Sequence, residues 1–129
     1  MWMDRWSGRT IGAAIAVHRA MGPGLLESVY ERCLAHELAA RGIPFELQRP
    51  VPICYRGAIL DGGLRLDLLV GGELVVELKS VERLLDLHDA QLLTYLRMTG
   101  SPVGLLLNFN TRLLRDGIRR LVNDSPDRI

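Results

Sequence analysis

The sequence has 129 residues, enough for one domain with a single hydrophobic core. Its apolar share of 48%, charged share of 24% and net charge of +1 are ordinary for a globular protein and argue against a broad basic binding surface. Any contact with nucleic acid would therefore be local, or would need help from a partner chain. No apolar run reaches the roughly 18–20 residues of a membrane span, no signal-peptide pattern is present, and Cys33 and Cys54 form neither a metal motif nor a disulfide framework. We therefore expect a cytoplasmic protein without a membrane contact.

Two helices are predicted in the first third of the chain. Residues 9–21 follow helical spacing, and Gly22-Pro23-Gly24 ends this helix. Residues 25–40 repeat the pattern, and Arg41-Gly42 closes the second helix with a basic last turn and a glycine cap.

Three strands are predicted next. Residues 45–55 read as a strand that two prolines interrupt, which indicates an edge strand or a bulge. Residues 57–63 are expected to turn into a strand at 64–70. Residues 73–80 form the following strand, which is entered through a glycine pair.

The last third of the chain is predicted to contain a helix followed by a strand. Residues 84–98 are predicted to form a helix, and Gly100-Ser101-Pro102 ends it. Residues 103–108 form a nearly continuous apolar run, typical of a strand buried on both faces. For the remainder a short helix or a strand is possible, and we favour a final strand at 117–122.

The resulting order is α-α-β-β-β-α-β, an α/β sandwich with a small mixed sheet. Residues 1–129 are interpreted as one domain. Residues 1–8 are expected to be a frayed lead, in which Trp2 and Trp6 either pack or form a contact surface.

The hairpin formed by residues 64–80 carries the charges of interest. Glu77 and Lys79 lie two residues apart on one strand and so project from the same face. A two-residue loop would mix polar with apolar residues across the ladder, whereas a three-residue loop at 71–73 sorts them. In that register Asp67 faces Glu77 and Arg65 faces Lys79. The apolar pairs on the other face would be Leu66 with Leu78, Leu68 with Val76, and Val70 with Leu74.

Facing carboxylates and facing cations are each unfavourable as bare pairs, and a divalent metal and a phosphate would relieve both. The alternative is a solvated hairpin face with ordinary mixed charges. One compositional fact favours the metal site: fifteen of the sixteen basic residues are arginine, and Lys79 is the only lysine. Lysine differs from arginine because its compact ammonium can lose its proton when buried.

Two helices offer further candidates. Glu27 begins the second helix, with Tyr30 one turn on, although the helix dipole alone would favour a carboxylate there. Gln91 and Tyr95 lie at i and i+4 on the third helix, with His88 one turn earlier, and could equally be its polar edge.

Carboxylates at 27, 67 and 77 with a single lysine suit a hard-cation site with oxygen ligands. Mg²⁺ or Mn²⁺ held by two carboxylates and a backbone carbonyl would keep water molecules for catalysis, polarise a phosphoryl oxygen and supply hydroxide. The three histidines are too scattered, and the cysteines too few, for zinc.

Four blocks in order resemble a known family. Asp67 followed by Glu77-Leu78-Lys79 resembles the PD-(D/E)XK nuclease signature, and residues 24–30 resemble the motif that names its GxxExxY branch. The run from Gln91 to Tyr95 is similar to an element of RecB-like nucleases, and residues 104–109 resemble the late strand of the branch. The resemblance runs from about residue 11 to residue 122.

The resemblance implies a restriction-endonuclease-like fold and a metal site. Asp67 and Glu77 would bind the metal, with the carbonyl of Leu78 as a third ligand. Glu27 would hold a metal-bound water or a second metal.

It also implies catalytic roles for three further residues. Lys79 would orient or activate the attacking water and stabilise developing charge. Gln91 and Tyr95 would position the scissile phosphate or the lysine. The proline of the signature is absent, because Arg65 stands two residues before Asp67.

We therefore expect a Mg²⁺-dependent nuclease that hydrolyses phosphodiester bonds, with DNA as the expected substrate, by in-line attack of water. The alternative is a non-catalytic module that binds nucleic acid or protein and keeps the nuclease fold. A third possibility is a subunit of a defence or repair complex. The oligomeric state stays open between a monomer, a homodimer and a complex with a partner subunit.

Overall fold

The computed structural model describes residues 3–123. Its five strands form one mixed sheet in the order β1-β2-β3-β4-β5, in which β3 and β4 are parallel and all other neighbours are antiparallel. The predicted α/β fold is confirmed. The elements are α1 (Ser7–Met21), α2 (Glu27–Ala40), β1 (Phe45–Tyr55), β2 (Ala58–Val70), β3 (Leu74–Lys79), α3 (Asp86–Thr99), β4 (Val103–Asn108), the short 3-10 helix η1 (Leu114–Gly117) and β5 (Ile118–Val122).

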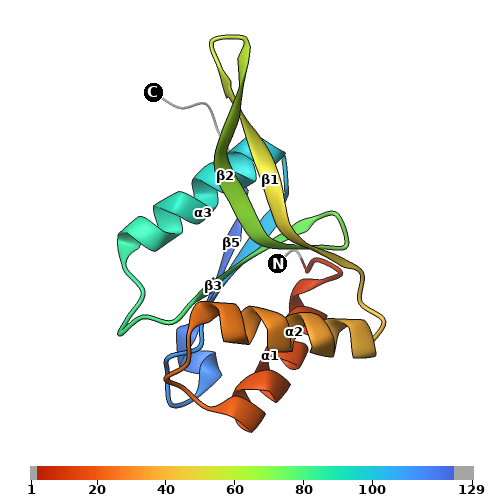
Figure 1. The fold of residues 1–129 in the computed structure, drawn as a ribbon, viewed down its shortest axis with the longest axis vertical. Coiled ribbons are helices and arrows are strands. Elements are labelled where there is room, and N and C mark those ends of the chain that lie inside the picture. The colour runs from red at the N-terminus through yellow and green to blue at the C-terminus, as the bar shows by residue number, and fades with distance from the viewer. Residues whose placement is uncertain (1–2, 124–129) are drawn as a thin grey trace.

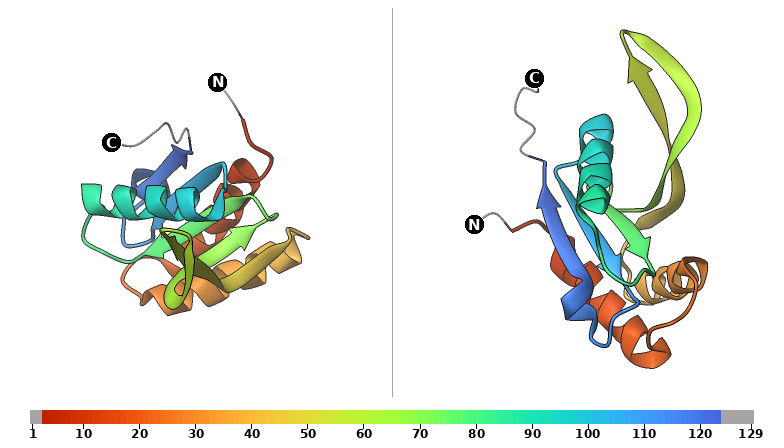
Figure 2. Two further views of the ribbon diagram at one scale, coloured as in Figure 1. Left: turned by 90° about the horizontal axis from the view of Figure 1, so that it is seen from above. Right: turned by 90° about the vertical axis from the view of Figure 1, so that its left-hand side faces the viewer.

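The sheet separates two apolar layers. Helices α1 and α2 cover one face, and α3 covers the other (Figures 1 and 2). Alternate residues of β3 serve the two layers: Leu74 and Val76 pack toward α1 and α2, whereas Val75 packs toward α3. All six residues of β4 are buried, as predicted for a strand covered on both faces. Among residues 3–123, no helix has the length and apolar character that crossing a membrane requires.

Helix α1 begins earlier than predicted. The side chain of Asp4 accepts hydrogen bonds from the backbone N–H groups of Trp6 and Ser7, at 3.0 and 2.8 Å, and so stabilises the first turn. Trp6 is only 6% exposed and packs against Gly71 in the turn between β2 and β3. The prediction of a frayed lead is therefore wrong from Asp4 onward, and Trp2 lies outside the described residues.

The β1–β2 hairpin is longer than predicted. Residues 58–63 belong to β2 and not to the turn, because the chain reverses at Arg56-Gly57, where both residues have positive φ (50° and 80°). That geometry suits a two-residue hairpin. The resulting hairpin arm (residues 51–64) extends beyond the other strands (Figure 1). The predicted edge position and irregularity of β1 are both confirmed, with the register shift between Val51 and Ile53.

The β2–β3 hairpin has the predicted three-residue loop. Leu68 pairs with Val76 and Val70 with Leu74, and the ladder contains three residue pairs in all. From Leu68 toward the beginning of β2, the two strands no longer pair. Two predicted cross-strand pairs, Leu66 with Leu78 and Arg65 with Lys79, therefore do not form. Leu66 packs in the layer under α3, whereas Leu78 packs in the layer under α1 and α2.

The second failed prediction concerns Arg65. Its partner in the sheet is Pro50 of β1, and its guanidinium donates to the carbonyl of Gln48 at 3.0 Å. It therefore does not face Lys79. The reason is the early end of the β2–β3 ladder, which leaves β2 paired only to β1 at this point.

Candidate active site

Two carboxylates occupy the place where β2 and β3 stop pairing. The Oδ2 atom of Asp67 accepts a hydrogen bond from the backbone N–H of Leu78 at 2.8 Å. In return, the backbone N–H of Asp67 donates to Oε1 of Glu77 at 3.2 Å. Each carboxylate thus takes the position of a missing backbone partner, which satisfies buried N–H groups that would otherwise be unpaired. The predicted meeting of Asp67 and Glu77 is confirmed.

Glu77 is strongly perturbed by this position. Its residue exposure is 7%, and its pKa is raised from the ordinary value of 4.5 to about 8, chiefly by burial. The charge of Asp67 contributes to this rise, whereas the backbone N–H of Asp67 and the charge of Lys79 oppose it. At neutral pH Glu77 therefore keeps its proton unless a cation lies beside the pair.

Lys79 is the last residue of β3 and is half-buried. Its carbonyl accepts from the backbone N–H of Phe109 at 2.9 Å, and the register pairs it with Asn108 of β4. The side chain of Asn108 is buried and holds Val81 by both its N–H, at 3.1 Å, and its carbonyl, at 3.0 Å. The backbone on both sides of the lysine is therefore fixed to β4.

Glu27 reaches the same region from α2. A small cavity of about 150 Å³ is lined by Glu27, Ser28, Glu31, Gln48, Asp67 and Leu78. The cavity therefore lies between the first two turns of α2 and the point where β2 and β3 separate. Glu27 itself is exposed, so its carboxylate is available to a ligand in this cavity.

The loop before Glu27 is tied to the end of β3. Ser80 donates its hydroxyl to the carbonyl of Leu25 at 2.6 Å. The hydroxyl of Tyr30 donates to the carbonyl of Gly22 and accepts from the backbone N–H of Leu25 at 3.2 Å. The Tyr30 ring also stacks on Phe109, with ring centroids 4.5 Å apart. Tyr30 is thus a structural residue that fixes the entry to α2.

Helix α3 contributes Tyr95 from the opposite side of the sheet. Burial raises the pKa of the Tyr95 phenol, and the charges of Glu77 and then Asp67 raise it further. The phenol therefore lies within electrostatic reach of both carboxylates. Gln91, one turn earlier, is exposed, and no hydrogen bond joins it to either carboxylate in the described part of the chain.

Three residues of the cavity, Ser28, Glu31 and Gln48, were not predicted as site residues. Glu31 lies four residues after Glu27 and so shares its helix face, a spacing that the sequence does display. Gln48 lies on β1, in a stretch without any motif. Its place depends on the pairing of β1 with β2, which local sequence does not encode.

The residues fit a hard divalent cation. Within residues 3–123, no three His, Cys, Asp or Glu side chains gather closely enough to hold a metal ion by themselves. Mg²⁺ does not require such a cage, because it is usually bound by one or two carboxylates together with water and substrate phosphates. Asp67 and the buried Glu77 supply two carboxyl groups, whose oxygens are the donors that this ion prefers.

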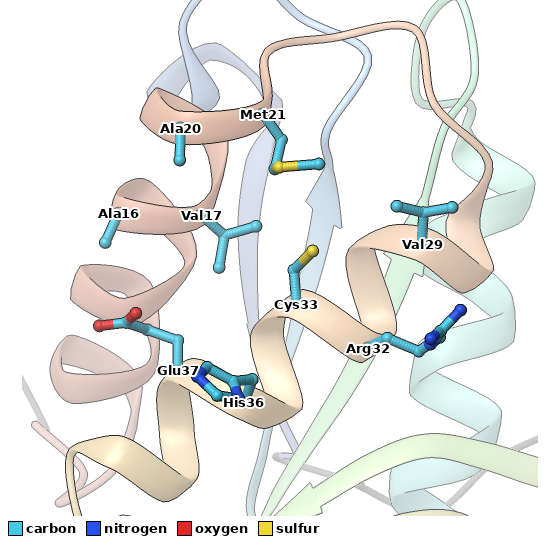
Figure 3. Close-up of a pocket in the computed structure, with 9 residues that line it drawn as sticks. All are labelled: Ala16, Val17, Ala20, Met21, Val29, Arg32, Cys33, His36 and Glu37. Carbon is cyan, nitrogen blue, oxygen red and sulfur yellow. The ribbon is translucent and has the colours of Figure 1, made fainter.

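A larger surface cavity lies elsewhere. A hollow of about 520 Å³ separates α1 from α2, and Figure 3 shows Val17, Met21 and Cys33 directed into the space between the two helices. Its lining is mainly apolar and contains none of the predicted site residues.

Fold and site together define a restriction-endonuclease-like α/β domain, with two carboxylates and a lysine where two strands of its sheet separate. A family model described as the PD-(D/E)XK nuclease superfamily matches residues 4–121, and the chain belongs to this superfamily. Comparisons with curated proteins and with solved structures gave no match. The finer assignment to the GxxExxY branch stays a prediction.

Proposed function

We propose that this protein is a metal-dependent nuclease that hydrolyses phosphodiester bonds of DNA by in-line attack of water. The observation that carries this proposal is the pairing of Asp67 with the buried Glu77 beside the only lysine of the chain. Such a pair is costly without a cation, because burial and mutual repulsion both act against its charge. A phosphodiesterase site, in which a metal ion neutralises the two carboxylates, explains why the pair is present.

The proposed ligands of the metal are Asp67, Glu77 and the carbonyl of Leu78, with Glu27 accepting from a bound water. Mg²⁺, or Mn²⁺ in its place, would polarise the phosphoryl oxygen and make hydroxide available near neutral pH. The ammonium of Lys79 would hold the attacking water in line and stabilise the negative charge that develops on the phosphate. Tyr95 and Gln91 would position the scissile phosphate from α3.

Cleavage of linear, circular and single-stranded DNA in Mg²⁺ tests this proposal. We expect Asp67→Asn to lower the rate about 100-fold or more, since the variant keeps the shape of the side chain and loses its charge. Asp61→Asn is the matched control, because Asp61 lies on the same strand but is exposed on the hairpin arm. Equal cleavage by wild type and Asp67→Asn would contradict the proposal.

One observation favours a second candidate function, a subunit that acts in a complex. The hairpin arm exposes Tyr55, Ile59 and Leu60 (60%, 74% and 47%), and a two-stranded hairpin alone is marginally stable in water. A protein partner or a second copy would cover these side chains. Full-rate DNA cleavage by a monomer, verified by light scattering, would contradict this dependence.

A further inference from the structure

Gln48 adopts a backbone conformation that a β-strand residue normally avoids. Its φ is 51°, and in residues 3–123 the only other residue besides glycine with positive φ is Arg56, in the hairpin turn. The pairs Leu47–Leu68 and Arg49–Leu66 keep one register on either side of it. Gln48 therefore stands opposite Asp67 but is skipped by the ladder. Strain of this kind concentrates at functional sites, where surrounding contacts hold it.

The contacts of Gln48 explain how it is held. Its side-chain amide donates to Oε1 of Glu31 on α2 at 2.5 Å. Its carbonyl accepts from the Arg65 guanidinium on β2 at 3.0 Å. The residue thus links α2 to the strand that carries Asp67.

Glu31 is directed to the cavity by this contact. Glu31 and Gln48 line it together with Glu27 and Asp67. Burial raises the pKa of Glu31, the Gln48 amide lowers it, and the charge of Asp67 raises it, so Glu31 lies within electrostatic reach of Asp67. One oxygen of Glu31 accepts from the amide, and no residue within 3–123 donates a hydrogen bond to the other oxygen.

A simple surface pair does not account for this arrangement. A glycine at position 48 would take the same backbone conformation without strain, and an exposed polar pair is worth little to stability. The chain has a strained glutamine opposite Asp67, with its amide on a carboxylate of the same cavity. The side chain must therefore supply something that glycine cannot.

We propose that Glu31, fixed by Gln48, is a positioning residue of the site and accepts a hydrogen bond from a water of the bound Mg²⁺. This inference rests on the proposed function. Mg²⁺ loses its waters reluctantly, so a site for it needs acceptors that touch the waters and not the ion. Removing such outer partners typically costs about 10- to 100-fold in metal affinity.

The test is a calorimetric titration of Mg²⁺ into DNA-free wild type, Gln48→Gly and Glu31→Gln, together with thermal unfolding in EDTA. We expect both variants to bind Mg²⁺ about 10- to 100-fold more weakly. Gln48→Gly should unfold in EDTA at the wild-type temperature or above, because glycine relieves the strain. Glu46→Gln is the control: this exposed carboxylate on β1 pairs with Arg49 and should leave Mg²⁺ affinity unchanged.

Asp67→Asn, titrated in parallel, separates the two proposals. If Asp67→Asn abolishes binding while Gln48→Gly and Glu31→Gln bind like wild type, this inference is overturned and the proposed function survives. A lower unfolding temperature with unchanged Mg²⁺ affinity would also overturn it, since that pattern describes a merely structural pair. A wild type that binds no Mg²⁺ would overturn both.

Discussion

Asp67 and Glu77 are held together by hydrogen bonds between their carboxylates and backbone N–H groups of the opposite strand. The N–H of Asp67 donates to the Glu77 carboxylate, and the Asp67 carboxylate accepts from the residue that follows Glu77. The two side chains cannot separate without breaking hydrogen bonds that stand in for the sheet ladder. This reciprocal arrangement holds the proposed metal ligands in place before any metal is bound, which lowers the cost of binding one.

The first prediction concerns stability and pH. The folded protein binds the Glu77 proton more tightly than the unfolded chain, since the pKa rises from 4.5 to about 8. The stability that this proton contributes is therefore fully present below pH 4.5 and is lost as the pH rises toward 8. We expect the unfolding temperature in EDTA to fall between pH 5 and pH 8, and Glu77→Gln to remove most of this fall. Identical pH profiles for the two proteins would contradict the assignment.

The second prediction concerns metal addition. A cation bound between Asp67 and Glu77 favours the ionised carboxylates, so Mg²⁺ should stabilise the protein more at pH 8 than at pH 5. Differential scanning calorimetry at both pH values, with Mg²⁺ and with EDTA, measures this difference. Stabilisation that is equal at both pH values would indicate binding away from this pair.

The third prediction separates chemistry from metal binding. Lys79→Ala should lower DNA cleavage about 100-fold or more while Mg²⁺ affinity stays within a few-fold of wild type. Lys79→Arg should not restore the rate, because the planar guanidinium cannot replace a compact ammonium. Arg115→Ala, an exposed cation on η1, is the control. Full activity of Lys79→Ala would exclude a catalytic role for the lysine.

The fourth prediction tests the loop before Glu27. Tyr30→Phe keeps the ring stacked on Phe109 but removes the hydroxyl that bridges Gly22 and Leu25. We expect a loss of about 1–3 kcal/mol in the free energy of unfolding, since the partly buried carbonyl of Gly22 and N–H of Leu25 lose their partner. Cleavage should also slow, because Glu27 follows this loop. A stable variant with wild-type activity would show that the loop needs no such anchor.

The fifth prediction uses two neighbouring glycines in the turn between β2 and β3. Gly71 and Gly72 both have positive φ (60° and 71°). A Cβ atom added at Gly71 would lie 2.0 Å from the Trp6 ring, whereas a Cβ atom added at Gly72 would have no atom of the described residues within 4 Å outside its own chain neighbours. Gly72→Ala should cost about 1–2 kcal/mol from backbone strain alone. Gly71→Ala should cost more and should raise the solvent exposure of Trp6, as fluorescence quenching would report. Equal costs would mean that Trp6 moves away freely.

Much of the architecture was predictable because apolar periodicity encodes it. The alternation along β3 and the glycine-rich loop selected the register that brings Asp67 to Glu77. The same reasoning failed at Leu66, because it assumed that a regular ladder continues where side chains in fact replace the backbone partners.

Other parts depended on contacts that are distant in sequence. The turn at Arg56-Gly57 was predicted too broadly, over residues 57–63, so the first part of β2 was assigned to the turn. Gln48 had no local signal, since its role arises only from its position opposite Asp67 and its contact with Glu31. Residue spacing in the sequence therefore identifies site residues that share one helix or strand, but it does not identify contacts between residues of different elements.

The role of Asp67 and Glu77 as metal ligands is tested most directly by a calorimetric titration of Mg²⁺, and separately of Mn²⁺, into wild type and Asp67→Ala. We expect one saturable binding event in the wild type that Asp67→Ala abolishes, with both proteins folded by circular dichroism. Equal binding by the two proteins would contradict the claim that Asp67 and Glu77 hold the catalytic metal.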